Sequence, residues 1–235
     1  SQTAQCGSEY RYVGNSRLQF CATSRMKLLY CITRSDTLGG AHIHVADMAA
    51  WMRKNGHDAR VVVGAEGPYC DHLTAKRVPY TTSRHLFRPI NVLTDVRAAG
   101  ELRRIFNANA PDLISLHSAK AGLIGRVASI GLGIPIQFTA HGWSFTDGVS
   151  KPRARLYREL ERLTAPLADR IITVSEYDRS LALDARVGKP DQVTAVHNAM
   201  PDVLALADPG RQGGPLRITM VARLDEPKDH ESLFK

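Results

Sequence analysis

The sequence of 235 residues lacks any apolar run approaching the roughly 18 residues that a membrane-spanning helix needs. Its first residues also lack the apolar stretch of a secretory signal peptide. The four cysteines, at positions 6, 21, 31 and 70, form no CxxC pair, so we expect reduced thiols and no cysteine zinc site. With 43% hydrophobic and 23% charged residues, the composition indicates a globular protein that we expect in the cytoplasm.

Acidic residues are outnumbered by basic ones, and the formal net charge is +8. Such a charge suits a polyanionic partner: nucleic acid, anionic lipid head groups or a phosphorylated substrate. Charge alone does not choose among these partners. A basic, solvated surface without any specific partner accounts for it equally well.

Residues 1–25 show no sustained hydrophobic period, and we expect them to form a leader outside the folded unit, which begins at Met26. From there, short apolar stretches alternate with segments of helical length. This alternation predicts an α/β fold with a doubly wound parallel sheet, Rossmann-like, over residues 26–207. The predicted strands lie in residues 27–33, 59–65, 111–118, 135–141, 170–176 and 192–199.

Two of the intervening segments carry apolar residues at helical spacing, and we expect these stripes to face the core. They consist of Ala41, Val45, Met48 and Met52 in the first segment, and of Val92, Val96, Ala99, Leu102 and Phe106 in the second.

Residues 200–216 are rich in proline and glycine and are typical of a linker. A new strand is predicted at 217–223, and a helix begins at about Asp229. The loop between them carries Arg223 and Lys228, so two cations and a helix N-terminus favour an anion here. We expect residues 208–235 to hold this linker and the start of a second domain.

Ligands of an open parallel sheet bind beyond the carboxyl ends of its strands. After the first strand, Gly39 and Gly40 would let a phosphate approach a helix N-terminus, unless they serve only a tight turn. After residues 135–140 comes His141, and its neighbours Gly142 and Trp143 favour a functional role for this histidine. A neutral imidazole there can hydrogen-bond a substrate, although a histidine satisfied by backbone is the alternative.

Two later strands bring Ser175, Glu176 and Asn198 to the same edge. The GxGxxG fingerprint is absent, which disfavours a nicotinamide oxidoreductase. His42 and His44 lie two residues apart on a predicted helix and so do not share a face. With no carboxylate or third histidine placed to join them, we expect no metal site.

Residues 151–163 form a basic predicted helix beside the expected cleft. This helix could rest on anionic lipid, or it could be a solvated face balanced by Glu159 and Glu161. Its basic residues are Lys151, Arg153, Arg155, Arg158 and Arg162.

Five segments occur in an order that resembles the GT-B glycosyltransferases of the family 4 type, retaining enzymes of polysaccharide and glycolipid synthesis. The resemblance covers Met26 to Lys235 and implies two Rossmann-like domains, an N-terminal one for the acceptor and a C-terminal one for the nucleotide-sugar. The segments are LGGAHIHV at 38–45, TAHGW at 139–143, TVSEYDR at 173–179, VHNAMP at 196–201 and VARLDEPKDH at 221–230.

The resemblance also implies roles. Gly39 and Gly40 would approach the donor phosphate, His141 would contact the transferred sugar, and Arg223 and Lys228 would bind the diphosphate without a metal. Asn198 joins them as a substrate-binding residue at the same edge.

The sequence departs from the family pattern in three places. Ala222 and Asp229 stand where the family often has glycine, and its Glu-x7-Glu motif would lie beyond Lys235. The chain is therefore expected to hold the acceptor domain and the first element of a truncated donor domain.

The partners that follow from the resemblance are a nucleotide-sugar and a glycan or lipid-linked acceptor, not nucleic acid, with no cofactor. A module that binds a glycan or a partner without catalysis is the alternative if these 235 residues are the whole protein.

Overall fold

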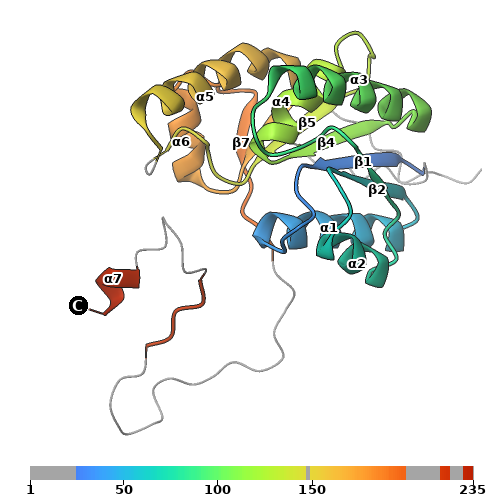
Figure 1. The fold of residues 1–235 in the computed structure, drawn as a ribbon, viewed down its shortest axis with the longest axis horizontal. Helices are drawn as coiled ribbons and strands as arrows, with labels where there is room; N and C mark the ends of the chain where they lie inside the picture. The colour runs from blue at the N-terminus through green and yellow to red at the C-terminus, as the bar shows by residue number, and fades with distance from the viewer. Residues whose placement is uncertain (1–24, 147–148, 200–217, 223–229, 235) are drawn as a thin grey trace, which may run out of the picture.

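The computed structural model describes residues 25–146, 149–199, 218–222 and 230–234 (Figure 1). Its strands are β1 (Lys27–Ile32), β2 (Asp58–Val63), β3 (Tyr80–Thr82), β4 (Leu113–His117), β5 (Ile136–Ala140), β6 (Arg170–Thr173) and β7 (Val193–Ala195). Its helices are α1 (Gly40–Lys54), α2 (Pro68–Ala75), α3 (Val92–Asn109), α4 (Ala119–Ala128), α5 (Lys151–Thr164), the 3-10 turn η1 (Ala165–Leu167), α6 (Glu176–Asp184) and α7 (His230–Leu233).

The seven strands form one sheet in the order β3-β2-β1-β4-β5-β6-β7, and all six pairings are parallel. In register, Ile32 at the end of β1 lies between Val63 of β2 and His117 of β4. The strands therefore end together at one edge, and the predicted doubly wound parallel sheet is confirmed.

Alternate residues of β1 enter two separate hydrophobic clusters, which places a core on each face of the sheet. Leu29 and Cys31 pack with residues of α3 and α4, whereas Leu28, Tyr30 and Ile32 pack with residues of α1 and α2. Cys31 is fully buried, as its place in the strand pattern predicted, and burial raises the pKa of its thiol to about 12.

The strand order reverses between β1 and β4. From β1 the chain winds outward through β2 and β3, whereas β4 begins the run in the opposite direction through β5, β6 and β7. The helices that follow these two neighbouring strands therefore leave toward opposite faces, with α1 on one and α4 on the other (Figure 1). A crevice opens at such a switch point, beyond the carboxyl ends of the strands, and it is where ligands bind in this architecture.

Two sequence predictions on this domain were wrong. The three-residue strand β3 was missed, because so short a segment has no periodicity to detect. Val92 and Val96, predicted to face the core, are 73% and 67% exposed. Helix α3 has 18 residues and is about 27 Å long, whereas a five-residue strand spans about 17 Å. The first turns of α3 therefore project beyond the carboxyl edge of the sheet. The stripe is buried where it meets the sheet, at Leu102 and Phe106.

The strand predicted at 217–223 is absent from its described residues, 218–222, where Ile218 and Val221 are 68% and 96% exposed. No described strand lies beside this segment to pair with it. Helix α7 begins at His230, close to the predicted position, and lasts one turn. The assignment of residues 208–235 to a second domain stays a prediction.

Candidate active site

The switch point is closed by hydrogen bonds between the residues that follow β1 and β4. The hydroxyl oxygens of Thr33 and Ser118 lie 2.8 Å apart, and the backbone N–H of Ala121 donates to the Thr33 hydroxyl at 3.0 Å. Ser118 has a φ of 76°, a conformation that strains a residue with a side chain. Strained backbone of this kind concentrates at functional sites, so this turn is the first marker of one.

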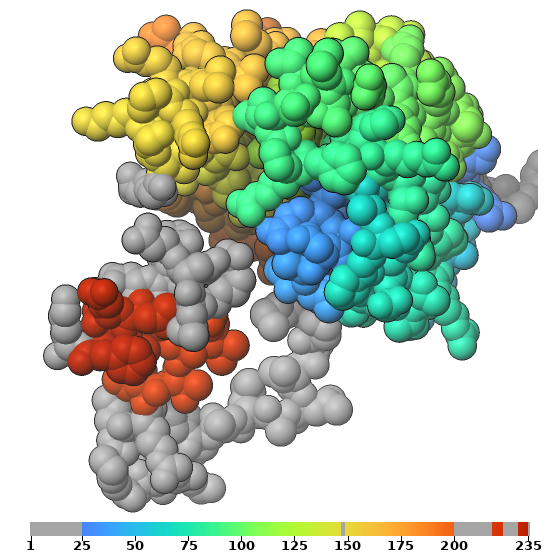
Figure 2. All heavy atoms as spheres, viewed as in Figure 1, coloured from blue at the N-terminus to red at the C-terminus, as the bar shows by residue number. Residues whose placement is uncertain are grey.

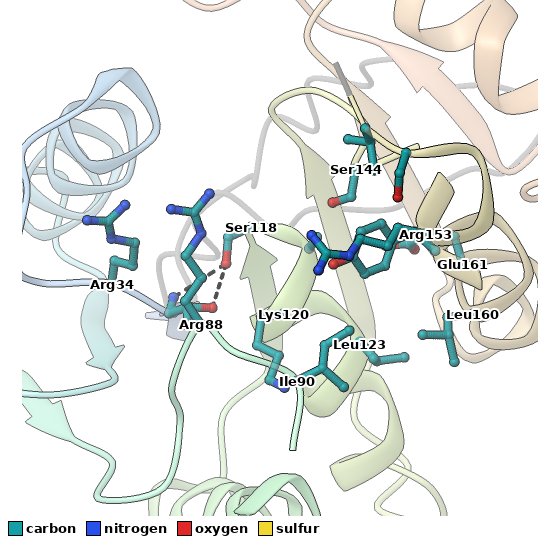
Figure 3. Close-up of a pocket in the computed structure, with 15 residues that line it drawn as sticks. Arg34, Arg88, Ile90, Ser118, Lys120, Leu123, Ser144, Arg153, Leu160 and Glu161 are labelled. Atoms are coloured by element: carbon teal, nitrogen blue, oxygen red, sulfur yellow. Dashed lines mark hydrogen bonds between the residues drawn. The ribbon is translucent and has the colours of Figure 1, made fainter. Parts of the chain in front are cut away.

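A cavity of about 510 Å³ opens beside this turn, between α4, α5 and the loop that precedes α3 (Figure 3). Arg34 and Arg88 reach it from one side and Arg153 of α5 from the other. Arg34 makes a bidentate ion pair with the exposed Asp36, whereas Arg88 and Arg153 have no acidic partner among the described residues. The cavity is therefore electropositive.

Buried ion pairs hold the walls of this cavity. Lys120, which lines it, lies 2.5 Å from a carboxylate oxygen of Asp95 and donates to the carbonyl of Pro89, and this fixes the loop before α3 against α4. Glu161 of α5 lies 2.5 Å from the guanidinium of Arg126 on α4, with both side chains buried. Burial raises the pKa of the Glu161 carboxyl, and the Arg126 charge opposes that rise.

Gly39 and Gly40 form the N-terminus of α1, at the carboxyl edge of the sheet. Gly39 has an extended backbone, and a Cβ on either glycine would meet no atom closer than 3.6 Å. Neither glycine is thus required by the turn itself, which contradicts the turn-only explanation. Their lack of side chains leaves space for a ligand at this end of the helix, where the His42 side chain already binds the N–H of Gly39.

His141 follows β5 at the same edge and is partly buried. Burial and then the neighbouring His44 lower the pKa of its imidazole to about 4, so the ring is neutral near pH 7. Gly142 has a φ of 125°, which requires glycine. Trp143, taken from the sequence as a sign of function, is instead buried against Phe138 and Phe145 and donates its indole N–H to the carbonyl of Asp178.

His141 is paired with a second imidazole that the sequence analysis missed. Its Nε2 lies 3.0 Å from Nδ1 of His117, the last residue of β4, and the other nitrogen of His117 lies 2.9 Å from the Ser115 hydroxyl. His117 is fully buried, and burial lowers its pKa well below the usual range. His117 lies near the carboxyl end of the predicted strand 111–118, so the rule that ligands bind beyond strand ends could have identified it.

His42 and His44 face different directions, as their spacing predicted. His42 accepts from the N–H of Gly39 through Nδ1 and donates through Nε2 to the carbonyl of Arg34, so it caps α1. The expectation that no third histidine lies near was wrong for His44. Its ring centroid is 5.3 Å from that of His141 and 6.0 Å from that of His117. Helical spacing could not reveal partners that come from β4 and β5.

The other residues predicted to line the site are not part of the histidine cluster in the described structure. Ser175 is the N-cap of α6, with its hydroxyl bound to Asp178, so its position is explained by the helix. Asn198 is exposed beyond β7, two strands away from β5. Arg223 and Lys228 lie outside the described residues. Within the described part of the chain, no helix has the length and apolar character to span a bilayer.

Residues 39–199, well over half of the chain, match the family described as glycosyl transferase 4-like domain, and the chain belongs to it. It is 24% identical over 144 residues to the UDP-Gal:alpha-D-GlcNAc-diphosphoundecaprenol alpha-1,3-galactosyltransferase of Escherichia coli, covering 61% of this chain and 37% of that protein. The chain thus spans less than half the length of this curated relative.

Solved structures show the same fold. Anabaena HepE in complex with UDP and glucose superposes with a TM-score of 0.60 at 22% identity, over 75% of this chain and 45% of that one. The lipopolysaccharide outer core galactosyltransferase WaaB, in its apo form, also gives 0.60, at 15% identity over 81% of this chain and 50% of that one. The fold is thus that of a GT-B glycosyltransferase of the family 4 type.

Proposed function

We propose that the chain carries the acceptor-binding part of a retaining glycosyltransferase, which moves a sugar from a nucleotide-activated donor to a glycan or lipid-linked acceptor without a metal. The observation that carries the proposal is the neutral His141, held by His117 at the carboxyl edge of a family 4-type domain.

His141 is the residue to which we assign contact with the transferred sugar. Its Nε2 is engaged by His117, while its Nδ1 has no hydrogen bond within the described residues and so is free for a sugar hydroxyl. A neutral ring can accept or donate there. Because its pKa is about 4, it does so across the whole neutral range without changing charge.

Departure of a nucleoside diphosphate builds negative charge on the leaving oxygen, which cations and helix N-termini stabilise. We assign this role to the N-terminal end of α1 at Gly39 and Gly40, and to Arg223 and Lys228 from the sequence pattern. Asn198 is assigned to substrate binding on the same basis. No metal is needed for such a step, because fixed positive groups meet the developing charge.

The cationic cavity is where we place the acceptor. Arg88 and Arg153 face it without acidic partners in the described chain, so an acceptor that carries phosphate would find two guanidinium groups there. The acceptor named for the Escherichia coli relative carries a diphosphate, which is consistent with this chemistry. A phosphate-bearing, lipid-linked acceptor is therefore preferred to a neutral glycan.

The same cavity lies between two surfaces suited to a membrane. Lys151, Arg155 and Arg158 are exposed and fall on one side of α5 with the partly exposed Arg162. Leu156 and Leu163 are 50% and 73% exposed on the same helix, which belongs to the yellow part of the surface in Figure 2. On the other side are the exposed apolar residues of the loop and first turns of α3: Phe87, Ile90, Val92, Leu93 and Val96. We propose that these surfaces rest on anionic lipid and present the cavity to a lipid-linked acceptor.

Transfer is tested in the full-length protein with a panel of nucleotide-sugars and acceptors that differ only in the diphosphate. Release of nucleoside diphosphate that depends on a diphosphate-bearing acceptor, and that persists with EDTA, supports the proposal. Absence of transfer to every acceptor, with donor and acceptor still bound, would favour a binding module.

Membrane contact is tested separately by co-sedimentation with vesicles of anionic or zwitterionic lipid. The charge reversals Arg155→Glu and Arg158→Glu together should abolish sedimentation with anionic vesicles, while reversal of Arg60, an exposed arginine on β2, should not. Equal binding by all variants would contradict this part of the proposal.

A further inference from the structure

Three imidazoles from distant parts of the sequence gather at the carboxyl edge, on the α1 face of the sheet. His44 comes from α1, His117 ends β4, and His141 follows β5. One nitrogen of each ring lies within 4.8 Å of the corresponding nitrogens of the other two. His117 is fully buried, whereas His44 and His141 are partly exposed and give solvent access to the cluster.

We propose that this cluster is a binding site for a divalent transition metal ion, with Zn²⁺ the best match, held by His44, His117 and His141. Zn²⁺ takes histidine nitrogens at about 2.0–2.1 Å, which in a tetrahedral arrangement sets the ligand nitrogens about 3.3 Å apart. Nδ1 of His117 and Nε2 of His141 are already 3.0 Å apart, so they need to separate by only about 0.3 Å. His44, on the accessible side, closes in to complete three ligands, and a water molecule takes the fourth position.

The hydrogen bond between His117 and His141 can be replaced by two bonds to the metal ion without the loss of a proton from the cluster. If Nδ1 of His117 donates to His141, its proton moves to Nε2, where it can donate to the Ser115 hydroxyl. If Nε2 of His141 is the donor, its proton moves to Nδ1 of the same ring. In either case both rings stay neutral, and each presents a lone pair to the ion.

Ser115 supplies the support that histidine ligands normally have. A metal-bound imidazole usually hydrogen-bonds a second group through its other nitrogen, which fixes the ring orientation. The Ser115 hydroxyl lies 2.9 Å from Nε2 of His117, and the side-chain amide of Gln137 on β5 donates to that hydroxyl at 3.4 Å. His117 is thus oriented from β4 and β5 together.

The donor set decides which ion fits. Three imidazoles without a carboxylate or thiolate suit Zn²⁺, Cu²⁺ and Ni²⁺, and not the oxygen-seeking Mg²⁺ or Ca²⁺. Because the three ligands come from three elements, a bound ion ties α1 to the sheet and should raise thermal stability. The site goes beyond the proposed transfer, which does not require it.

The test is a titration of Zn²⁺ into the purified 235-residue chain without a histidine tag, followed by calorimetry. Co²⁺ serves as a second probe, because its visible spectrum distinguishes tetrahedral from octahedral coordination. His44→Gln removes a ligand at the accessible side, where folding is least at risk. His42→Gln is the matched control, since it removes a histidine from the same helix and glutamine at this position preserves the helix cap.

We expect one Zn²⁺ per chain, a tetrahedral Co²⁺ spectrum and a raised melting temperature with Zn²⁺. Loss of an outer partner costs about 10- to 100-fold in affinity, so Ser115→Ala should weaken binding about tenfold and His44→Gln at least about 100-fold. His42→Gln should bind as the unaltered chain does. The proposal is overturned if the unaltered chain binds no Zn²⁺, or if His44→Gln binds it equally well. Neither result bears on transfer, which is assayed with EDTA present.

Discussion

Nδ1 of His117 lies 3.0 Å from Nε2 of His141, so a fully buried ring orients a ring that stands at the edge of the crevice. His117 is in turn fixed by Ser115 on the same strand. While the two imidazoles stay hydrogen-bonded to each other, Nδ1 is the nitrogen of His141 that is left for a sugar hydroxyl. The position of this nitrogen is therefore set by β4 and β5, which are paired in register through His117 and Thr139.

His141→Ala in the full-length protein should lower kcat about 100-fold or more while changing the melting temperature little. The reason is that the imidazole is assigned to the reacting sugar, and loss of one such contact typically costs about 10²–10³ in rate. Steady-state transfer and thermal unfolding are measured on the same preparation. His57→Ala, a histidine just before β2 at the opposite edge, is the control. Parallel losses of activity and stability would instead support a purely structural histidine.

Arg88→Ala and Arg153→Ala should each raise the KM for a phosphate-bearing acceptor about fivefold, with the KM for the nucleotide-sugar unchanged. Both side chains are exposed, so each contact is worth only about 1 kcal/mol. Arg60→Ala, which removes an exposed guanidinium from β2, is the matched control. An unchanged acceptor KM in both variants would place the acceptor outside this cavity.

The pKa of His141, about 4 in the folded chain, lies below the usual histidine value near 6.5. Between those pH values the unfolded chain binds a proton that the folded chain does not, so stability is full above pH 6.5 and is lost as the pH falls toward 4. His44 and His117, with pKa values lowered by burial, act in the same direction.

Each such histidine steepens the pH dependence of the free energy of unfolding by up to about 1.4 kcal/mol per pH unit. Denaturant unfolding from pH 7 to pH 4.5 should show a shallower decline for His141→Gln than for the unaltered chain. Identical slopes would mean that His141 titrates normally in the folded state.

The sequence predicted the sheet well because buried parallel strands are near-continuous apolar runs, as in residues 59–65 and 135–141. Sequence patterns did not predict the features that depend on how the elements are arranged in space. Val92 and Val96 lie on a helical stripe that extends past the sheet, and no periodicity reveals where a sheet ends. His44 gains its partners only when α1, β4 and β5 meet.

At the candidate site, the sequence did not reveal that Trp143 is buried. An aromatic residue beside His141 and Gly142 favoured a functional site, yet Trp143 is 5% exposed and packs in the core. The strand-end rule predicted the position of His141 at the carboxyl edge of the sheet, where the structure has it, but the rule does not tell which neighbours turn inward. Burial of individual side chains had to come from the structure.

The pair Arg126 and Glu161 joins α4 to α5 under the cationic cavity, and it gives a stability prediction that is separate from catalysis. Arg126 is fully buried, donates to the carbonyl of Gly122 and lies 4.4 Å from the centroid of the Phe138 ring. Removing one partner leaves the other charge buried and uncompensated. Glu161→Leu or Arg126→Met should therefore cost about 3–5 kcal/mol in the free energy of unfolding.

The double variant Arg126→Met/Glu161→Leu distinguishes a charge effect from a packing effect. Because it removes both charges and keeps most of the apolar volume, it should lie well above either single variant in stability, within about 1–2 kcal/mol of the unaltered chain. One nitrogen of Arg126, Nη1, has no hydrogen-bond partner among the described residues, so the pair is imperfectly satisfied even in the native chain. Denaturant unfolding of the four chains completes the cycle. Additive losses in the double variant would show that the two side chains stabilise the α4–α5 contact independently, and that the ion pair between them contributes nothing.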